Sequence, residues 1–374
     1  MTIDTTWLRE ALDDREKKGI YRYLNSYLGL VDFCSNDYLG ISKSKEFGSL
    51  KNRFLKKFDI ENQEGATGSR LISGNSSIAL ETEKFISTFH KVEAALIYST
   101  GYAANVGLLS AIAKRGDTII SDEHIHASLI DGVRLSNAKR LRFEHNNLID
   151  LENKLKKTEG RCFVVVESVY SMDGDISPLI DISNLCDKHN AYLIVDEAHA
   201  IGVYGDKGEG LVSKMGLENK VWARVVTFGK AMGTHGAAVL GSKLLIDFLI
   251  NFSRSFIYST ALPPDACASI FSSYELVKNA SNQRELLSNN IRYFKKAAGL
   301  RKLKMINSNS PIQGVYVDGN KDGKNKELKL REQGLACKAI LSPTIPEGKE
   351  RLRISLHSYN TFKEIDLLVN TLSQ

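Results

Sequence analysis

The sequence predicts an α/β fold, in which a mainly parallel β-sheet is covered by helices on both faces. From about residue 90, apolar stretches of strand length alternate with helical stretches, an order typical of parallel strands joined by helical crossovers. The chain has 374 residues, 43% of them hydrophobic, which is enough for a large core in more than one subdomain. After about residue 265 the pattern changes, which indicates a second and smaller domain.

The first residues predict an amphipathic helix followed by a short extended segment. In TTWLREALDDREKKGIYRYL, residues 5–24, apolar side chains recur at helical spacing with charged side chains elsewhere. We expect residues 1–44 to form an arm that packs on a larger body.

Five apolar stretches predict parallel strands in a large domain of residues 45–265. They are AALIYST (94–100), TIISD (118–122), RCFVVVES (161–168), AYLIVDEAH (191–199) and ARVVTF (223–228). Helical stretches lie between them, including NVGLLSAIAKRG (105–116) and LIDISNLCDKHN (179–190). A sixth stretch, GAAVLGS (236–242), follows too soon for a parallel crossover, so it should pair antiparallel at or near a sheet edge.

The remaining residues, 266–374, predict a smaller C-terminal α/β domain. A long helix is expected through SIFSSYELVKNA (269–280). Strand, helix and strand candidates follow in GVYVDG (314–319), ELKLREQG (327–334) and RLRISLH (351–357). The polar run GNKDGKNKE (319–327) is expected to be a solvated loop.

Composition favours a small-molecule enzyme of the cytoplasm. The formal net charge of +6 suits an anionic ligand, and the absence of a dense basic tract with interleaved aromatic residues argues against nucleic acid. The five cysteines are scattered without a close metal-binding pair, which favours reduced thiols and no metal site. The start of the chain has no apolar signal core, and LLIDFLINF (244–252) is too short and too polar at Asp247 to span a membrane.

Polar side chains follow four of the predicted strands at the points where these strands end. In open parallel sheets, ligands bind outside the carboxyl ends of the strands. The residues at these ends are Thr100 to Tyr102, His124 and His126, Glu167 to Gly174, and Asp196 to His199. The sequence therefore predicts a ligand site at one edge of the sheet.

Lys230 lies in the predicted loop between the strands VVTF and GAAVLGS. One interpretation is that it begins a solvated turn, because lysine is almost never fully buried without a partner. The other is that a pocket desolvates the amine and lowers its pKa, so that the neutral form attacks a carbonyl and forms a Schiff base. The surrounding residues must decide between them.

The tetrad DEAH (196–199) also occurs in nucleotide-driven helicases, where the strand end binds a metal. Such an enzyme needs a phosphate-binding loop of the form G-x-x-x-x-G-K-[ST]. Here Lys230 is followed by Ala231, and Arg224 stands five residues before Gly229. The sequence therefore argues against a nucleotide-hydrolysing enzyme.

A cofactor explains more of these residues. Pyridoxal 5'-phosphate (PLP), an electron-sink aldehyde, needs a lysine to bind it, a carboxylate beside its pyridine nitrogen, and a cradle for its phosphate. Lys230 and Asp196 supply the first two, and the helix that begins near Gly101 and Tyr102 offers backbone N–H groups to a phosphate. Taken alone, Asp196 is also explained as a buried helix cap.

Other side chains extend the predicted PLP site. Thr227, Ser259 and Thr260 add hydroxyl groups near the phosphate. His126 could stack on the cofactor ring, and His199 could hydrogen-bond its phenolic oxygen, although a lone histidine is more often a satisfied, partly buried side chain. Both histidines follow strands that end at the same edge, which favours the functional interpretation.

With these residues assembled, the chain resembles the α-oxoamine synthase family of PLP enzymes over nearly its whole length. The resemblance rests on nine segments in order: SNDYLG (35–40), GSRLISGN (68–75), STGYAAN (99–105), DEHIHAS (122–128), ESVYSMDGD (167–175), VDEAHAIG (195–202), TFGKAMG (227–233), FIYSTALPP (256–264) and RLRIS (351–355). It implies the aspartate-aminotransferase-like fold (PLP fold type I), with a seven-stranded sheet in the large domain.

The resemblance also implies roles for single residues. The catalytic residues would be Lys230, which binds PLP covalently, Asp196, which pairs with the pyridinium, and His126, which stacks on the ring. His199 would contact the phenolic oxygen of PLP, and Ser171 would lie near the ring.

Phosphate contacts are implied for Gly101, Tyr102 and Thr227, with Ser259 and Thr260 reaching across from a partner subunit, because the sites of this family form at a homodimer interface.

Two further residues are implied in substrate binding. Asn36 matches an active-site asparagine, and Arg353 matches the arginine that binds the substrate carboxylate. A guanidinium offers the planar, bidentate contact that a carboxylate accepts well.

The implied reaction is a decarboxylative condensation of an amino acid with an acyl thioester, which releases CO2 and a free thiol. The stretches TFGKAMGTHGAAVLGS (227–242) and FIYSTALPP favour the branch of biotin synthesis that joins L-alanine to a pimeloyl thioester. Branches that use glycine or serine with another acyl-CoA remain open, and so does the carrier, CoA or an acyl carrier protein. A binding or regulatory protein that keeps the fold without catalysis is the alternative of another class.

Overall fold

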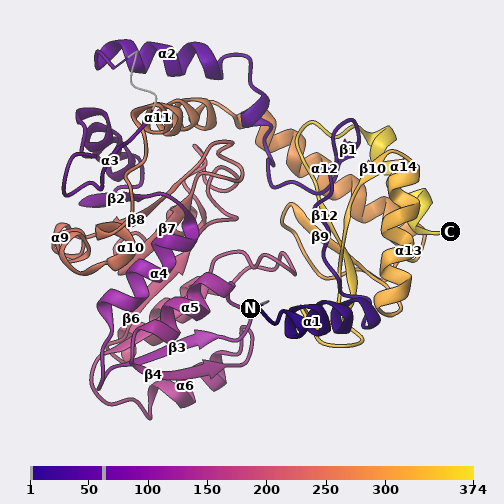
Figure 1. The fold of residues 1–374 in the computed structure, drawn as a ribbon, viewed down its shortest axis with the longest axis horizontal. Helices are drawn as coiled ribbons and strands as arrows, with labels where there is room; N and C mark the ends of the chain where they lie inside the picture. The colour runs from indigo at the N-terminus through magenta and orange to yellow at the C-terminus, as the bar shows by residue number, and fades with distance from the viewer. Residues whose placement is uncertain (1–2, 61–64) are drawn as a thin grey trace. The chain divides into compact units, whose positions relative to one another are not determined.

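The computed structural model describes residues 3–60 and 65–374, which fall into two compact units. The large unit comprises Asn36–Ser171 and Asp175–Glu285, and the small unit comprises Met1–Ser35, Met172–Gly174 and Leu286–Gln374. Figure 1 labels many of the helices and strands of both units. The boundaries expected from the sequence at residues 44 and 265 remain predictions.

The large unit is built on a seven-stranded, mostly parallel sheet in the order β2-β8-β7-β6-β5-β3-β4. The strands are β2 (Ala94–Tyr98), β3 (Thr118–Asp122), β4 (Lys139–Phe143), β5 (Cys162–Glu167), β6 (Tyr192–Asp196), β7 (Ala223–Thr227) and β8 (Ala237–Gly241). The five predicted parallel stretches are all strands, and β8 pairs antiparallel with both β2 and β7, one position from the sheet edge as predicted.

Strand β4 is not among the strands predicted from the sequence. Its sequence KRLRF alternates charged and apolar residues, and only Phe143 at its end is buried. Because β4 is an edge strand that pairs with β3 alone, much of it faces water and its composition resembles that of a surface segment.

Helices cover both faces of the sheet. One face packs against α4 (Gly101–Ile112), α5 (Ala127–Leu135), α9 (Lys243–Phe252) and α10 (Arg254–Ile257). The other packs against α6 (Leu148–Leu155), α7 (Leu179–Lys188) and α8 (Leu211–Lys214). Successive strand residues alternate between the two cores: Ile119 belongs to the first and Ile120 to the second.

A smaller core in the same unit joins its remaining helices. The core residues come from α2 (Phe47–Lys57), α3 (Ser77–Phe89) and α11 (Pro264–Lys278). The short helix η1 (Ile41–Lys43) contacts α2 and α11. The rings of Phe54 and Phe271 lie 4.1 Å apart between α2 and α11, next to the fully buried Ile78. The long helix predicted through residues 269–280 is therefore confirmed as α11.

In its described residues, from Ile3 onward, the small unit contains two short sheets and four helices. Strands β11 (Lys338–Ile340), β12 (Arg351–Ser355) and β9 (Ile312–Tyr316) form an antiparallel sheet in that order, and β1 (Val31–Asp32) pairs in parallel with β10 (Leu335–Ala336). The helices are α1 (Thr6–Lys17), α12 (Ser281–Leu300, which begins in the large unit), α13 (Gly319–Glu332) and α14 (Phe362–Leu372). The predicted N-terminal helix and the strand, helix and strand of this region are confirmed.

The loop predicted for residues 319–327 is wrong, because these residues form the first turns of α13. Only Gly323 and Leu330 are buried on this helix, so its sequence is polar on nearly every side. A Cβ atom on Gly323 would lie 2.9 Å from the Leu341 side chain, so the glycine permits close packing there instead of ending the helix. Across the residues described, the structure contains no helix with the length and apolar character needed to cross a membrane.

Candidate functional site

Lys230 lies in the hairpin that connects β7 to β8, as predicted. The loop is held at both ends, since the Phe228 N–H donates to the Gly236 carbonyl at 2.9 Å and the Thr234 N–H to the Phe228 carbonyl at 2.8 Å. Inside it, the Gly233 N–H donates to the carbonyl of Lys230 itself at 2.8 Å. Lys230 therefore sits on a short turn fixed to the sheet, with a partly buried side chain.

A chain of hydrogen bonds leads from Lys230 to Asn36. Lys230 Nζ lies 2.8 Å from His199 Nε2, and His199 Nδ1 lies 2.8 Å from the Tyr38 hydroxyl. Tyr38 donates to Asn36 Oδ1 at 3.0 Å, so its oxygen accepts from Nδ1–H of His199. Nε2 is then free of a proton and accepts from the lysine. The structure thus brings together three residues named from the sequence, Asn36, His199 and Lys230.

Asp196 ends strand β6 and is buried, with 4% of its surface exposed. Its Oδ2 accepts from the Asn105 side-chain amide at 2.7 Å, and its Oδ1 accepts from the Ala198 N–H at 2.9 Å. Two donors on different oxygens fix the plane of the carboxylate, which favours a role as an oriented, charged acceptor.

His126 caps the N-terminus of α5 and shares a hydrogen-bond network with Asp196. The Ser128 N–H donates to His126 Nδ1 at 3.2 Å, so Nδ1 carries no proton. The Ser128 hydroxyl lies 2.8 Å from the same nitrogen and accepts from Asn105 at 2.9 Å. Burial lowers the pKa of His126. The charge of Lys230 lowers it further, and Asp196 acts in the opposite direction. His126 is therefore a neutral imidazole that carries its proton on Nε2.

Glu167 is a site residue whose role the sequence analysis did not predict. It ends β5 directly opposite Asp196 in the sheet register, and its Oε1 accepts from the His126 N–H. Burial, together with the negative charge of Asp196, raises its pKa to about 8, although Lys230 acts in the opposite direction. At neutral pH the carboxyl group of Glu167 is therefore mostly protonated.

Two of the residues predicted to hold a phosphate, Gly101 and Thr227, form a close-packed cradle. Gly101 is the first residue of α4, where backbone N–H groups have no partner within the helix. A Cβ atom at Gly101 would lie 2.6 Å from Thr227 Cγ2, so only glycine fits against this threonine. Within the part of the chain that the structure describes, the buried Thr227 hydroxyl finds no hydrogen-bond partner. A buried orphan hydroxyl beside helix N–H groups fits a phosphate.

Tyr102 follows at the second position of α4, and its hydroxyl donates to Asp131. The side chain is about half exposed, and the contact of Tyr102 with a phosphate stays a prediction.

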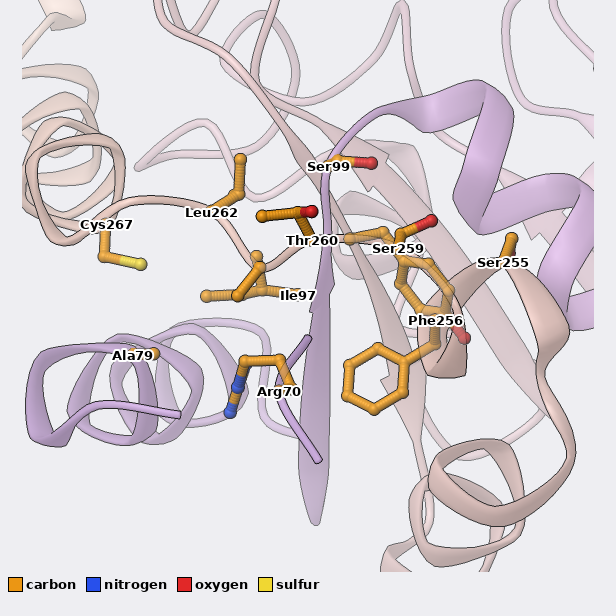
Figure 2. Close-up of a pocket in the computed structure, with 12 residues that line it drawn as sticks. Arg70, Ala79, Ile97, Ser99, Ser255, Phe256, Ser259, Thr260, Leu262 and Cys267 are labelled. Carbon is orange, nitrogen blue, oxygen red and sulfur yellow. The ribbon is translucent and has the colours of Figure 1, made fainter. Parts of the chain in front are cut away.

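Ser259 and Thr260 line a small pocket together with Arg70, Phe256 and Cys267 (Figure 2). Its volume of about 20 Å³ holds roughly one water molecule. The pocket itself therefore has no room for a cofactor, and the contact of Ser259 and Thr260 with a partner subunit's cofactor stays a prediction.

Ser171 and Arg353 complete the residues named from the sequence. Ser171 lies in the turn after β5. Arg353 is in the middle strand of the small unit's antiparallel sheet, where its Nη1 donates to Ser355 Oγ at 2.9 Å. Their roles beside the ring and at the substrate carboxylate remain predictions.

The glutamate of the DEAH tetrad belongs to the core. Glu197 is fully buried and accepts from Arg224 Nε and from the Val212 N–H, both at 2.9 Å. Arg224 is itself 1% exposed. A carboxylate paired in this way is a structural anchor, which argues further against a metal-binding strand end of a nucleotide hydrolase.

The residues that were not predicted from the sequence form hydrogen bonds to the predicted site residues: Asn105 to Asp196, Ser128 to His126 and Tyr38 to His199. Asn105, Ser128 and Tyr38 lie inside the quoted segments STGYAAN, DEHIHAS and SNDYLG, but no role was assigned to them. Asn105 offered a usable signal, because it is a polar residue on an otherwise apolar helix and such residues are buried only with partners.

Several known proteins are similar to this chain over nearly its whole length. The 8-amino-7-oxononanoate synthase of Marinobacter nauticus is 37% identical over 98% of this chain and 95% of its own length. The serine palmitoyltransferase of S. paucimobilis, solved with PLP and myriocin bound, is 28% identical with a TM-score of 0.88 over 98% of this chain and 96% of its own. The 8-amino-7-oxononanoate synthase of Francisella tularensis is 29% identical, with a TM-score of 0.80 over 92% of this chain and 97% of its own.

A family model covers almost the whole chain. The model described as aminotransferase class I and II matches residues 29–372, which include every site residue named above. With its mostly parallel seven-stranded sheet and its lysine on the β7–β8 hairpin, this chain belongs to the aminotransferase class I and II family.

Proposed function

We propose that this chain is a PLP-dependent acyltransferase that condenses L-alanine with a pimeloyl thioester and produces 8-amino-7-oxononanoate, CO2 and a free thiol. Relatives named for this activity, at 34–39% identity, align with nearly the full chain, which supports the reaction. The observation that carries the proposal is the convergence of Lys230, Asp196, His126 and His199 at the carboxyl ends of neighbouring strands.

The described residues fit PLP. Lys230 would hold its aldehyde carbon, Asp196 its pyridine nitrogen, and Gly101, Tyr102 and Thr227 its phosphate, for which the orphan hydroxyl of Thr227 is the structural support. When bound, PLP supplies an electron sink that stabilises negative charge at the substrate Cα. His126 and Ser171 would lie beside its ring.

The protein's own groups would then move protons and hold the substrate. The amine of Lys230 takes the Cα proton of alanine, and it is placed for this by its hydrogen bond to His199 Nε2. Asp196 keeps a negative charge fixed before the reaction begins, because its two donors already hold the carboxylate in place.

His126 and Arg353 act on the substrates. As a neutral imidazole with its proton on Nε2, His126 can donate a hydrogen bond to the thioester carbonyl, where negative charge develops. Arg353 would hold the amino-acid carboxylate until it leaves as CO2.

The decisive experiment measures free-thiol release by the purified, PLP-loaded protein. Pimeloyl-CoA is supplied with L-alanine, glycine or L-serine in parallel, and the product is identified by mass spectrometry. Release with alanine, together with an amino-oxononanoate product, supports the proposal. Release with glycine or serine alone contradicts the choice of amino acid, and the same assay with a pimeloyl acyl carrier protein identifies the carrier.

A second candidate is an α-oxoamine synthase that uses serine or glycine with a different acyl-CoA. The similarity to serine palmitoyltransferase over 98% of this chain favours it as the alternative. A long-chain acyl-CoA with L-serine tests it in the same assay.

We also propose that the chain works as a homodimer with shared sites in the cytoplasm. Apolar side chains are exposed on and beside α9, among them Leu71, Leu80, Leu244 and Phe252. Next to them is a cavity of about 400 Å³ whose lining includes Leu71, Leu80 and Ile250. Exposed apolar surface of this kind is typical of an interface between subunits. The scattered cysteines support the cytoplasmic location.

A further inference from the structure

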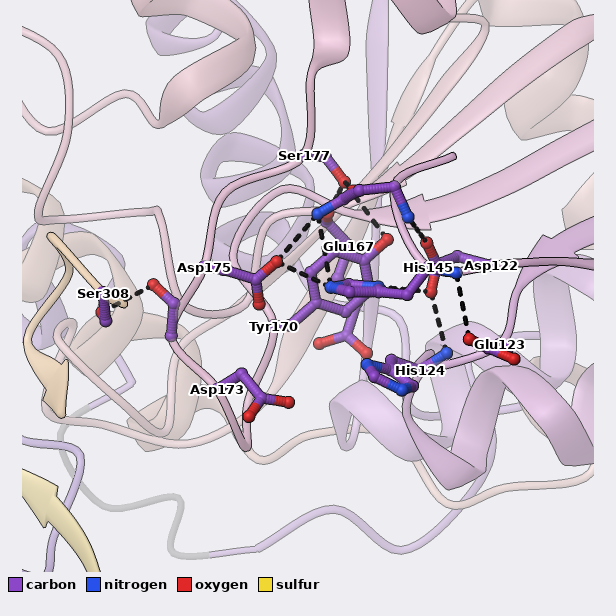
Figure 3. Close-up of polar contacts among 12 residues, drawn as sticks. Asp122, Glu123, His124, His145, Glu167, Tyr170, Asp173, Asp175, Ser177 and Ser308 are labelled. Carbon is purple, nitrogen blue, oxygen red and sulfur yellow. Dashed lines mark hydrogen bonds and ion pairs between the residues drawn. The ribbon is translucent and has the colours of Figure 1, made fainter. Parts of the chain in front are cut away.

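A second cluster of ionisable side chains lies beside the proposed cofactor site, and no step above uses it. Its centre is His145, which follows the edge strand β4 (Figure 3). His145 Nδ1 lies 2.9 Å from Asp122 Oδ1, and Nε2 lies 2.7 Å from Asp175 Oδ2. An ionised carboxylate can only accept, so each ring nitrogen must donate and His145 is an imidazolium.

The two carboxylates come from neighbouring strand ends. Asp122 is the last residue of β3 and is fully buried, and Asp175 follows the turn after β5. Asn146 reinforces both contacts, because its backbone N–H donates to Asp122 at 2.9 Å and its side-chain amide donates to Asp175 at 2.8 Å. Burial opposes the positive charge, but the hydrogen bonds to Asp122 and Asp175 outweigh it and raise the pKa of His145 to about 9.

The cluster is connected directly to the turn that carries His126. Asp122 Oδ1 accepts the His124 N–H at 2.8 Å as well as His145 Nδ1–H. The rings of His124 and His145 are stacked, with centroids 4.2 Å apart and planes inclined by 25°. The backbone N–H of His145 donates to Glu123 at 3.1 Å. Asp122, Glu123 and His124 therefore each contact His145, and they directly precede Ile125 and His126 in the chain.

We propose that His145 is a positioning residue, whose imidazolium locks the turn of residues 122–126 and so keeps His126 in place at the proposed active site. From there the contacts continue through His126, whose N–H donates to Glu167, and through Ser128 and Asn105 to Asp196. The inference about catalysis rests on the proposed function, whereas the inference about the turn does not.

The first test measures amide hydrogen exchange in the protein without added PLP. His145→Gln removes the charge and one of the two ring contacts. Exchange of the amides of residues 124–128 should become about tenfold faster or more, because the turn can open locally, while segments that exchange by local opening elsewhere keep their rates. Unchanged exchange in these residues would overturn the proposal.

His189 offers a matched control. His189 follows the last residue of α7, and its side chain is 17% exposed against 19% for His145. It also faces a carboxylate, because its Nε2 lies 3.5 Å from Glu152 in α6. His189→Gln should leave the exchange of residues 124–128 as in the unsubstituted protein. Faster exchange there in both variants would count against a specific role for His145.

The second test uses the PLP-loaded enzyme. His145→Gln should retain the visible absorbance of bound PLP and a KM for the amino acid within about twofold, while kcat falls about tenfold as His126 loses its fixed position. A kcat within twofold of the unsubstituted enzyme would overturn the catalytic part. If the unsubstituted protein shows no PLP absorbance, the proposed function fails, and the exchange result stands by itself.

If His145→Gln does not fold, the unsubstituted protein supplies the test. The groups that face His145 are Asp122, Asp175, His124, Tyr170 and the Glu123 carboxylate on its backbone N–H. After correction for intrinsic exchange, protection of residues 124–128 should fall as the pH passes through about 9 and the imidazolium loses its proton. Constant protection between pH 7 and 10 would contradict the proposal.

Discussion

His199 lies between Lys230 and Tyr38, with one ring nitrogen 2.8 Å from each partner. The tyrosine fixes which nitrogen of the imidazole carries the proton, and the lysine contacts the other one. Through this arrangement the Tyr38 hydroxyl determines which nitrogen of His199 can accept a hydrogen bond from the Lys230 amine.

A double-mutant cycle tests this relay. Tyr38→Phe should weaken PLP binding or slow turnover by about tenfold, because the imidazole loses its fixed tautomer, and His199→Ala should cost more. Since Tyr38 acts through His199, the double variant should be no worse than His199→Ala alone. Independent, additive losses in kcat/KM would contradict the relay.

Asp196→Asn should separate PLP binding from chemistry. Asparagine keeps the shape of the side chain but loses the charge, so PLP should still bind while exchange of the alanine Cα proton falls by a factor of about 10² to 10³. The exchange is measured by NMR in deuterium oxide. Lys230→Ala is the reference, because it removes the amine itself and should abolish both exchange and turnover. Near-normal exchange in Asp196→Asn would contradict the role assigned to the charge.

Thr227→Val should maintain or raise the stability of the PLP-free protein but lower its affinity for PLP. Valine has the same shape but no orphan hydroxyl, so the PLP-free protein should be as stable or up to about 1 kcal/mol more stable, while PLP affinity falls about tenfold. Thr82 is the matched control, since it is also buried but its hydroxyl donates to the Ile78 carbonyl at 2.7 Å. Thr82→Val should destabilise the protein and leave PLP affinity unchanged. Thermal unfolding and PLP titration measure both quantities, and a normal PLP affinity in Thr227→Val would argue against the phosphate cradle.

Stability should decrease as the pH rises above neutrality. His145 has a folded-state pKa of about 9 against about 6.5 in an unfolded chain, so its contribution is complete below pH 6.5 and is lost as the pH passes through 9. The loss is at most roughly 3 kcal/mol. Glu167, with a pKa raised to about 8, acts in the same direction, because the folded state binds its proton more tightly. Denaturant unfolding between pH 6.5 and 9 measures the slope, which His145→Gln should flatten; an equal slope in that variant would contradict the assignment.

Shared active sites can be tested by mixing inactive subunits. Lys230→Ala should complement a Ser259→Ala, Thr260→Val subunit, because one site of each mixed dimer then contains no substitution. A statistical mixture should recover roughly a quarter of the normal activity. Lys230→Ala mixed with Asp196→Asn is the control and should recover none, because both residues belong to the same chain's site. Equal recovery in the two mixtures would contradict a site shared between subunits.

Sequence patterns predicted the strands that bear the site because those strands are buried on both faces. Their apolar runs end abruptly in polar residues, and that boundary is visible without a structure, as at Asp196 and Glu167. Lys230 was also placed correctly, since a hairpin too short for a crossover leaves one geometry for the residues between its strands.

The missed features depend on partners that are distant in sequence. Strand β4 resembles a surface segment because it lies at the sheet edge, and α13 resembles a loop because little of it is buried. The importance of His145 arises from Asp122 and Asp175, which lie 23 and 30 residues away. No local pattern reveals that a histidine after a charged strand is held between two carboxylates.

The β7–β8 hairpin has a consequence for competition between amines. Because hydrogen bonds from Phe228 to Gly236 and from Thr234 to Phe228 close the base of this hairpin, the Lys230 backbone is held and its amine moves mainly by rotation of its own side chain. An amine tethered in this way has an effective concentration at its target carbon far above that of any free amine in solution. If Lys230 holds the aldehyde carbon of PLP as proposed, its amine would compete for that carbon better than free amines in solution, and the protein should keep its cofactor through many turnovers.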